Sequence, residues 1–164
     1  MTRVIRSGLV ILAFLLSACG GEPSQAPREA PAPPAAAPSA PASPRFDGLY
    51  RTEPQPWAGS TRVHWLRFYA NGRVVEAMTG PESRPEEVAA WLDFGHPDAR
   101  QRGRYELADG HVRIETQSDS SRHLAHGTLE HDGIAVEWRD RTNDQRDTRR
   151  FRFAPIAGWA VAAE

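Results

Sequence analysis

The sequence predicts an all-β domain in which eight antiparallel strands close into a barrel with one accessory helix. The turn signals Asn71-Gly72, Asp109-Gly110 and Asp132-Gly133 each separate two runs in which apolar and polar residues alternate. A helical pattern occurs within one long connection between strands. Closure into a barrel is expected because it removes the exposed edges of an antiparallel sheet.

The first element, residues 1–18, has the features of a secretory signal. Arg3 and Arg6 precede an apolar run at 9–16, and the small residues Ser17 and Ala18 follow it. An apolar run of this length covers roughly 12 Å as a helix, which is too short to cross a membrane core of roughly 30 Å. Residues 16–19, Leu-Ser-Ala-Cys, resemble the lipobox of bacterial lipoproteins. The alternative is an ordinary secretory signal with an incidental Cys.

The lipobox resemblance implies that signal peptidase cuts before Cys19 and that its thiol carries diacylglycerol. Cys19 is the only Cys in 164 residues, so the chain has no intramolecular disulfide. The three acyl chains typical of such lipoproteins, palmitate among them, would anchor the protein stably. By resemblance to Gram-negative lipoproteins, Gly20 after the Cys implies sorting to the outer membrane, with the protein facing the periplasm.

Residues 19–45 form the lipidated N-terminus and a tether. From 22 to 45, eight of 24 residues are Pro and eight are Ala. Such a segment buries too little apolar surface to offset its ordering entropy, so we expect disorder. In extended polyproline II conformation it would reach roughly 70 Å. A Pro-rich ligand for another protein is the alternative interpretation.

The domain spans residues 46–155, with strands expected at 47–52, 62–70, 73–79, 103–108, 111–117, 122–131, 134–140 and 148–154. Period-2 alternation assigns eleven side chains to the barrel interior. They are Tyr50, Leu66, Phe68, Tyr105, Leu107, Val112, Ile114, Val136, Trp138, Phe151 and Phe153. Six of these are aromatic, which predicts a mostly filled interior.

The expected helix begins at Ser83 as N-cap, with Pro85 in its first turn and Glu86 as the capping-box partner, and ends at Gly95. Its predicted apolar stripe consists of Val88, Ala89, Trp91 and Leu92. Such a helix can plug one end of a barrel or cover a side. The remaining residues, 156–164, form a tail whose apolar side chains could cover the barrel end.

The domain resembles the calycin or lipocalin-like group of small barrels. Gly48-Leu49-Tyr50 is similar to the Gly-x-Trp of the first strand in that group, with Tyr in place of Trp. The resemblance implies that an Arg of the last strand, Arg149, Arg150 or Arg152, packs over this aromatic ring. It implies a topology and no substrate.

The residue pattern does not point to catalysis or to a cofactor. The chain has no Lys, and it has no Gly-x-Ser-x-Gly, Gly-rich phosphate loop or His-Glu-x-x-His motif. Twenty basic residues balanced by 21 acidic ones argue against nucleic-acid binding. His123, His126 and His131 suggest a metal site, but residues three apart on a strand point to opposite faces. We therefore expect no metal, no cofactor and no catalytic residue.

Trp57 lies in a Pro-rich loop at 53–59, where it either covers the barrel as part of the core or contacts a ligand or partner at the open end. The residues expected to line a ligand site are Tyr50, Trp57, Phe68, Tyr105, Trp138 and Phe151.

The sequence thus predicts a lipid-anchored envelope lipoprotein whose non-catalytic barrel binds a small apolar molecule or another envelope protein. The alternative is a periplasmic inhibitor or an assembly factor that acts through its loops around a filled barrel. An enzyme is the third possibility.

Overall fold

The computed structural model describes residues 43–96 and 101–159. The predicted signal peptide, Cys19 and nearly all of the predicted tether lie outside these residues. The strands are β1 (Gly48–Thr52), β2 (Gln55–Trp57), β3 (Ser60–Phe68), β4 (Arg73–Thr79), β5 (Gln101–Ala108), β6 (His111–Gln117), β7 (Arg122–Leu129), β8 (Gly133–Asp140) and β9 (Arg146–Pro155). One helix, α1 (Pro85–Trp91), lies in the connection between β4 and β5.

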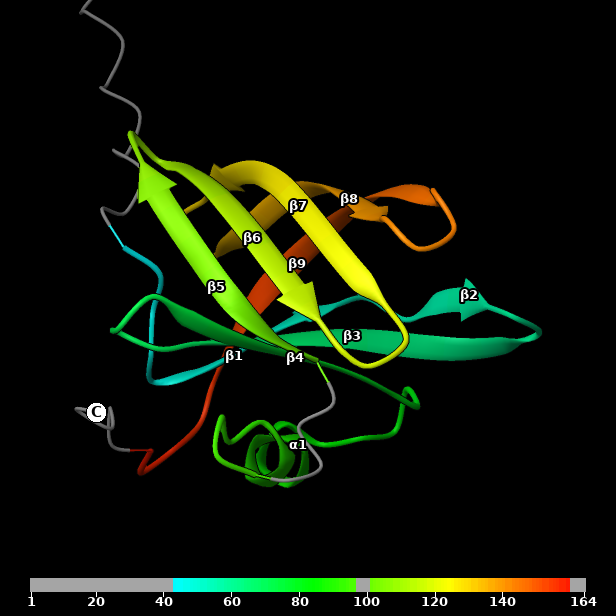
Figure 1. Ribbon diagram of the computed structural model, residues 1–164. Coiled ribbons are helices and arrows are strands. Elements are labelled where there is room, and N and C mark those ends of the chain that lie inside the picture. Colours follow the sequence, from blue (N-terminus) through cyan, green and yellow to red (C-terminus); the bar gives the residue numbers. More distant parts are fainter. Residues whose placement is uncertain (1–42, 97–100, 160–164) are drawn as a thin grey trace, which may run out of the picture. The chain divides into compact units, whose positions relative to one another are not determined.

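Eight of the strands form a closed antiparallel barrel (Figure 1). Closure occurs at β1, where Tyr50 lies opposite Phe153 of β9 on one side and opposite Leu66 of β3 on the other. The short β2 pairs with the first half of β3, and this β2–β3 arm extends past the other strands. The predicted all-β fold with one helix is confirmed and is consistent with a lipocalin-like barrel.

The three turn signals mark real hairpins, but their backbones differ. Asp109 and Gly110 both have positive φ, as a type I′ turn requires. At the first hairpin only Gly72 does, and its N–H donates to Tyr69 O, so that β3 ends at Phe68 before a longer turn. Gly133 has no positive φ; a Cβ there would lie 2.0 Å from the Phe151 carbonyl oxygen, so close backbone approach requires glycine.

The apolar part of the barrel interior is filled by side chains. Eight of the eleven side chains predicted to face inward belong to one buried cluster, together with Val74, Ala125, Leu129 and Ile134. The other three, Tyr105, Leu107 and Phe153, are partly buried and pack against it. The Phe68 ring packs edge-on against Tyr50 and Tyr105, with centroids 5.2 and 4.9 Å apart. The predicted alternation therefore identifies the inner face correctly.

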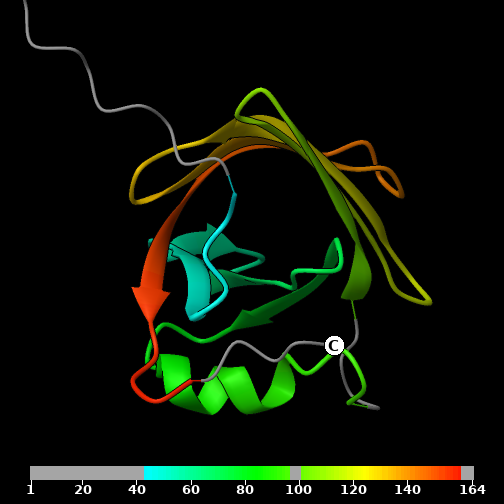
Figure 2. The ribbon, with the colours of Figure 1, turned by 90° about the vertical axis from the view of Figure 1, so that its left-hand side faces the viewer.

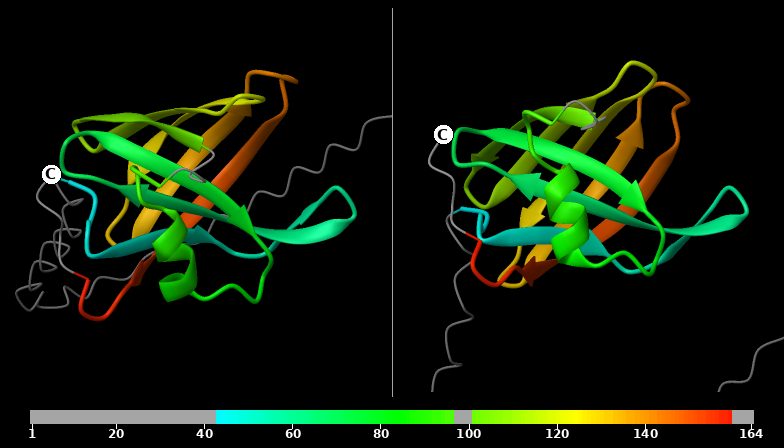
Figure 3. Two further views of the ribbon diagram at one scale, coloured as in Figure 1. Left: turned by 60° about the horizontal axis from the view of Figure 1, so that its bottom comes forward. Right: turned by 90° about the horizontal axis from the view of Figure 1, so that it is seen from below.

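A second apolar cluster lies outside the barrel, between α1 and the outer face of β1, β3 and β4. It contains Leu49, Val63, Trp65, Tyr69, Val75, Val88, Ala89 and Leu92. The helix thus covers a side of the barrel and does not plug an end (Figures 2 and 3). Two buried donors are satisfied within this layer: Trp65 Nε1 donates to Thr79 Oγ1 at 2.8 Å, and the Tyr69 hydroxyl donates to Leu92 O at 2.6 Å.

The helix boundaries differ from the prediction by one residue at the start and several at the end. Arg84, and not Ser83, is the N-cap, and its N–H donates to Glu87, which takes the place predicted for Glu86. The helix ends at Trp91, four residues before Gly95. Trp91 is 51% exposed, because at about 100° per residue it lies away from the face shared by the three buried residues of the predicted stripe.

Residues 156–159 of the predicted tail pack against this outer layer and not over the barrel end. Ile156 and Trp159 contact the outer cluster, and the Arg67 guanidinium lies 4.2 Å from the centroid of the Trp159 ring. In the described part of the chain, no helix has the length and apolar character needed to cross a membrane.

The Arg stacking implied by the calycin resemblance is not found at Tyr50 in the described residues. Arg149 stacks on Trp138 and Arg150 pairs with Glu130. Instead, the Tyr50 hydroxyl accepts the Arg45 N–H at 2.7 Å.

We predict that Leu92→Ala lowers the free energy of unfolding by about 2–5 kcal/mol, because it opens a cavity between α1 and the barrel. The neighbouring Trp91→Ala removes a larger side chain, but one that is half exposed. It should change the free energy of unfolding by less than about 1 kcal/mol. Urea denaturation of both variants measures the difference. Equal effects would contradict the assignment of α1 as the cover of an outer core.

Candidate functional site

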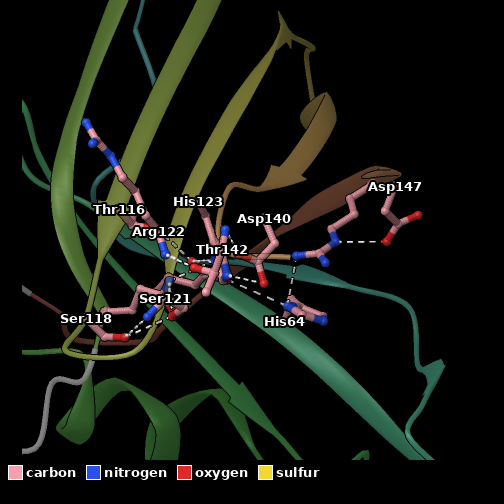
Figure 4. A network of polar contacts seen from close by, with 12 residues as sticks. His64, Thr116, Ser118, Ser121, Arg122, His123, Asp140, Thr142 and Asp147 are labelled. Carbon is pink, nitrogen blue, oxygen red and sulfur yellow. Dashed lines mark hydrogen bonds and ion pairs between the residues drawn. The ribbon is translucent and has the colours of Figure 1, made fainter. Parts of the chain in front are cut away.

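The barrel interior changes from apolar to polar toward one end. Most of the polar side chains at that end lie two positions from an inner apolar residue on the same strand, as His64 lies from Leu66 and Glu76 from Val74. The side chains of this polar layer are His64, Glu76, Gln101, Thr116, His123, Asp140, Asp147 and Arg149. Figure 4 shows that His64, His123, Asp140 and Asp147, from four different strands, lie near one another.

Glu76 of β4 is the most buried charge in this layer. Its side chain is 3% exposed, and its Oε2 contacts His123 Nδ1 and accepts the Thr116 hydroxyl, both at 2.9 Å. Burial raises the pKa of the Glu76 carboxyl, the contact with His123 lowers it, and the net result is a pKa of about 2. Glu76 is therefore a buried carboxylate that stays ionised at neutral pH.

Arg149 of β9 is the buried cation of the layer, with 4% of its side chain exposed. Its Nε donates to Asp147 at 3.0 Å, and its guanidinium lies 4.6 Å from the centroid of the Trp138 ring. Its Nη1 lies 3.1 Å from His64 Nδ1. Because a guanidinium only donates, Nδ1 of His64 is the acceptor in this contact and carries no proton.

His123 of β7 lies between two carboxylates. Nδ1 contacts Glu76, and Nε2 is 3.9 Å from Asp140 Oδ2. The Gln101 side-chain amide also reaches Nδ1 at 2.9 Å, and the imidazole packs edge-on against Trp138 at 5.3 Å. The ring is thus held in one orientation by contacts from three other strands, β4, β5 and β8.

A pocket of about 600 Å³ opens over these groups. It lies between the β2–β3 arm and the ends of β4, β5, β7, β8 and β9. Its polar walls include Glu76, His64 and His123, and its apolar walls are formed by Pro56, Trp57, Ala77 and Met78. The site therefore offers an amphipathic surface at the barrel mouth, with fixed charges at its base.

The residues predicted to line a ligand site divide into two groups. Trp57 and Trp138 border the pocket. Trp57 is 37% exposed and lies on β2, with its ring 5.9 Å from that of His64. Tyr50, Phe68, Tyr105 and Phe151 belong to the apolar cluster of the interior. They do not line this pocket.

His123 is recognisable in the sequence as a candidate site residue, but its partners His64 and Glu76 are not among the predicted site residues. As expected for residues three apart on a strand, His123 faces inward while His126 is exposed, and His131 is exposed beside a turn. Among the described residues, no group of three or more His, Cys, Asp or Glu side chains is placed to hold a metal ion. His64 and Glu76 could have been found by extending the inner alternation past the apolar positions of β3 and β4.

Two polar atoms at the site lack hydrogen-bond partners among the described residues. One is the indole Nε1 of Trp138, which is buried. The other is Oε1 of Glu76, which lies 3.8 Å from His64 Nδ1 and accepts no hydrogen bond from the described residues. The buried Trp138 indole N–H carries a desolvation cost that a ligand group or a water molecule can relieve. Oε1 of Glu76 can accept a hydrogen bond from a ligand that enters the pocket.

Comparisons with known protein families, curated proteins and solved structures give no significant match. The barrel and the chemistry of its mouth are therefore the features that bear on function.

We predict that Glu76 makes folding sensitive to acid. Its folded pKa of about 2 lies below its ordinary value of 4.5, so its ionised form stabilises the fold above pH 4.5 and this contribution is lost as the pH falls toward 2. The loss should reach roughly 3 kcal/mol. Other carboxylates titrate in the same range, so the measurement is the difference between the wild type and Glu76→Gln in urea denaturation from pH 7 to pH 2. Parallel curves would show that Glu76 is not the acid-sensitive group.

Proposed function

We propose that the protein is a lipid-anchored, non-catalytic binding protein of the bacterial outer membrane that holds a small molecule at the mouth of its barrel, facing the periplasm. The observation that carries this proposal is the pocket over Glu76, His64 and His123. A concave site with apolar walls and a few fixed polar groups is the usual form of a small-molecule site. Membrane attachment comes from Cys19 and requires nothing from the barrel.

The position of the pocket bears on the kind of ligand. The apolar part of the interior is occupied by side chains of the protein, with Phe151 and Ile134 fully buried. A purely apolar ligand would have to displace them, whereas an amphipathic ligand can use the pocket as it stands. The small apolar molecule expected from sequence is therefore replaced in this proposal by a molecule with both polar and apolar parts.

A second candidate function is docking of an envelope protein on the β2–β3 arm. Trp57 and Met78 are large apolar side chains that are 37% and 43% exposed, and both border the pocket. Exposed apolar groups close to one another are typical of interaction surfaces. Here the protein would act as an inhibitor or assembly factor through this arm.

Changing Cys19→Ala should move the protein from the membrane fraction to the soluble fraction or leave it unprocessed, because the acyl chains would be absent. Fractionation of cells after a high-salt wash, with immunoblotting, measures the distribution. Membrane retention of a processed Cys19→Ala protein would contradict the lipid anchor.

Native mass spectrometry of the full-length protein, extracted from cells in mild detergent, tests the binding function. We expect a bound small-molecule mass that is reduced in Trp57→Ala, because this variant removes one wall of the pocket. Trp91→Ala is the matched control, since it removes an exposed Trp from α1, away from the pocket. Equal retention in both variants would contradict a site at the barrel mouth. A bound protein mass lost only in Trp57→Ala would favour the docking function.

A further inference from the structure

We infer that the pocket selects an organic cation, a ligand in which a protonated nitrogen, such as an amine or amidine, is attached to an apolar body. This inference rests on the proposed binding function and specifies the chemistry that the same site recognises. It follows from the charges that border the pocket, from the unpartnered oxygen of Glu76 and from the apolar wall.

The charges that border the pocket are unequal in number. Three carboxylates border it, those of Glu76, Asp140 and Asp147, against the two guanidinium groups of Arg146 and Arg149. Arg149 is already engaged by Asp147 and His64. Arg146 is at the rim, where its side chain is 69% exposed and is 3.9 Å from Asp144. The buried charge that has no guanidinium partner is therefore negative.

The two carboxylate oxygens of Glu76 differ in their partners. Oε2 has two partners, His123 and Thr116, but among the described residues Oε1 receives no hydrogen bond. His64 Nδ1, 3.8 Å away, accepts from Arg149 and has no proton to donate. A charged N–H donor from a ligand would complete this carboxylate, and such charge-assisted hydrogen bonds are the strong ones.

Asp140 also borders the pocket and is more exposed to solvent than Glu76. Its Oδ1 accepts the Thr142 N–H at 2.8 Å, and its Oδ2 is 3.9 Å from His123 Nε2. Its side chain is 14% exposed. Asp140 thus adds a second negative charge on the way to Glu76, which favours entry of a cation and opposes entry of an anion.

The apolar wall of the pocket favours an organic cation over a bare metal ion as the ligand. Pro56, Trp57 and Met78 offer carbon surface and no ligand that a hard metal prefers. Aromatic rings such as the Trp57 indole attract organic cations through their faces. The described residues hold no group of metal-ligating side chains. The pocket volume of about 600 Å³ suits a molecule of several rings or a short chain.

The test compares three probes of similar shape and different charge: 2-phenylethylamine, 2-phenylethanol and phenylacetate. Each is titrated into the full-length protein in detergent at pH 7 by calorimetry. We expect the amine to bind at least about tenfold more tightly than the alcohol, and phenylacetate to bind more weakly than either. Equal affinity for the three probes, or tighter binding of phenylacetate, would overturn the inference.

Variants locate the selectivity. Glu76→Gln should reduce the preference for the amine over the alcohol to within about threefold, since the charge is lost and the shape is kept. Glu86→Gln on α1, an exposed carboxylate that does not border the pocket, is the matched control and should keep the full preference. Equal preferences in the two variants would overturn the role of Glu76. If Glu76→Gln fails to fold, Asp140→Asn at the rim should weaken amine binding and leave the alcohol unchanged.

The outcomes separate this inference from the proposed function. If Trp57→Ala abolishes binding of a cellular ligand but the amine binds no better than the alcohol, the barrel mouth is a binding site. The inference that this site selects cations is then wrong. If none of the three probes binds at about 10 mM, where even weak sites of this size are occupied, the inference fails whatever the cellular ligand proves to be.

Discussion

Closure of the barrel at β1 is the constraint on which the rest of the structure depends. β1 pairs with β9 and β3 at once, so the eight-stranded ring has no free edge. Closure also separates each strand into inward and outward positions. Leu49 and Tyr50 are adjacent in sequence and both buried, yet they belong to different clusters. Two hydrophobic cores therefore share the same strands.

The outer core exists because β1, β3 and β4 are apolar on both faces. Val63 and Trp65 alternate with inward residues of β3 and would be exposed without a cover. The short helix α1 supplies that cover, with Val88 and Leu92 against the sheet. A helix of seven residues is unstable alone in water, so its position here is a result of packing.

The polar layer at the barrel mouth is the other consequence of closure. Once the strands are closed, every inward side chain must either pack or find polar partners. Glu76 meets this requirement with His123 and Thr116, and Arg149 with Asp147 and His64. These residues come from five strands, β3, β4, β6, β7 and β9, which converge only in the closed barrel. Their contacts hold the charged groups rigidly. A rigid, partly unsatisfied site is suited to binding, because a ligand need not order the side chains that it contacts.

The amino-acid sequence by itself determined the class of fold, the approximate strand boundaries and the inner apolar side chains, because turn chemistry and period-2 alternation are local properties. Only the tertiary structure decided which polar residues meet. His64 and Glu76 are 12 residues apart and His123 is 47 residues beyond Glu76, and register across β4 to β7 brings their side chains together. Packing likewise decided where the helix lies, why Trp91 is exposed and that Trp159 contacts the outer core. The apolar pattern of the helix alone is compatible with a helix over one end of the barrel or along its side.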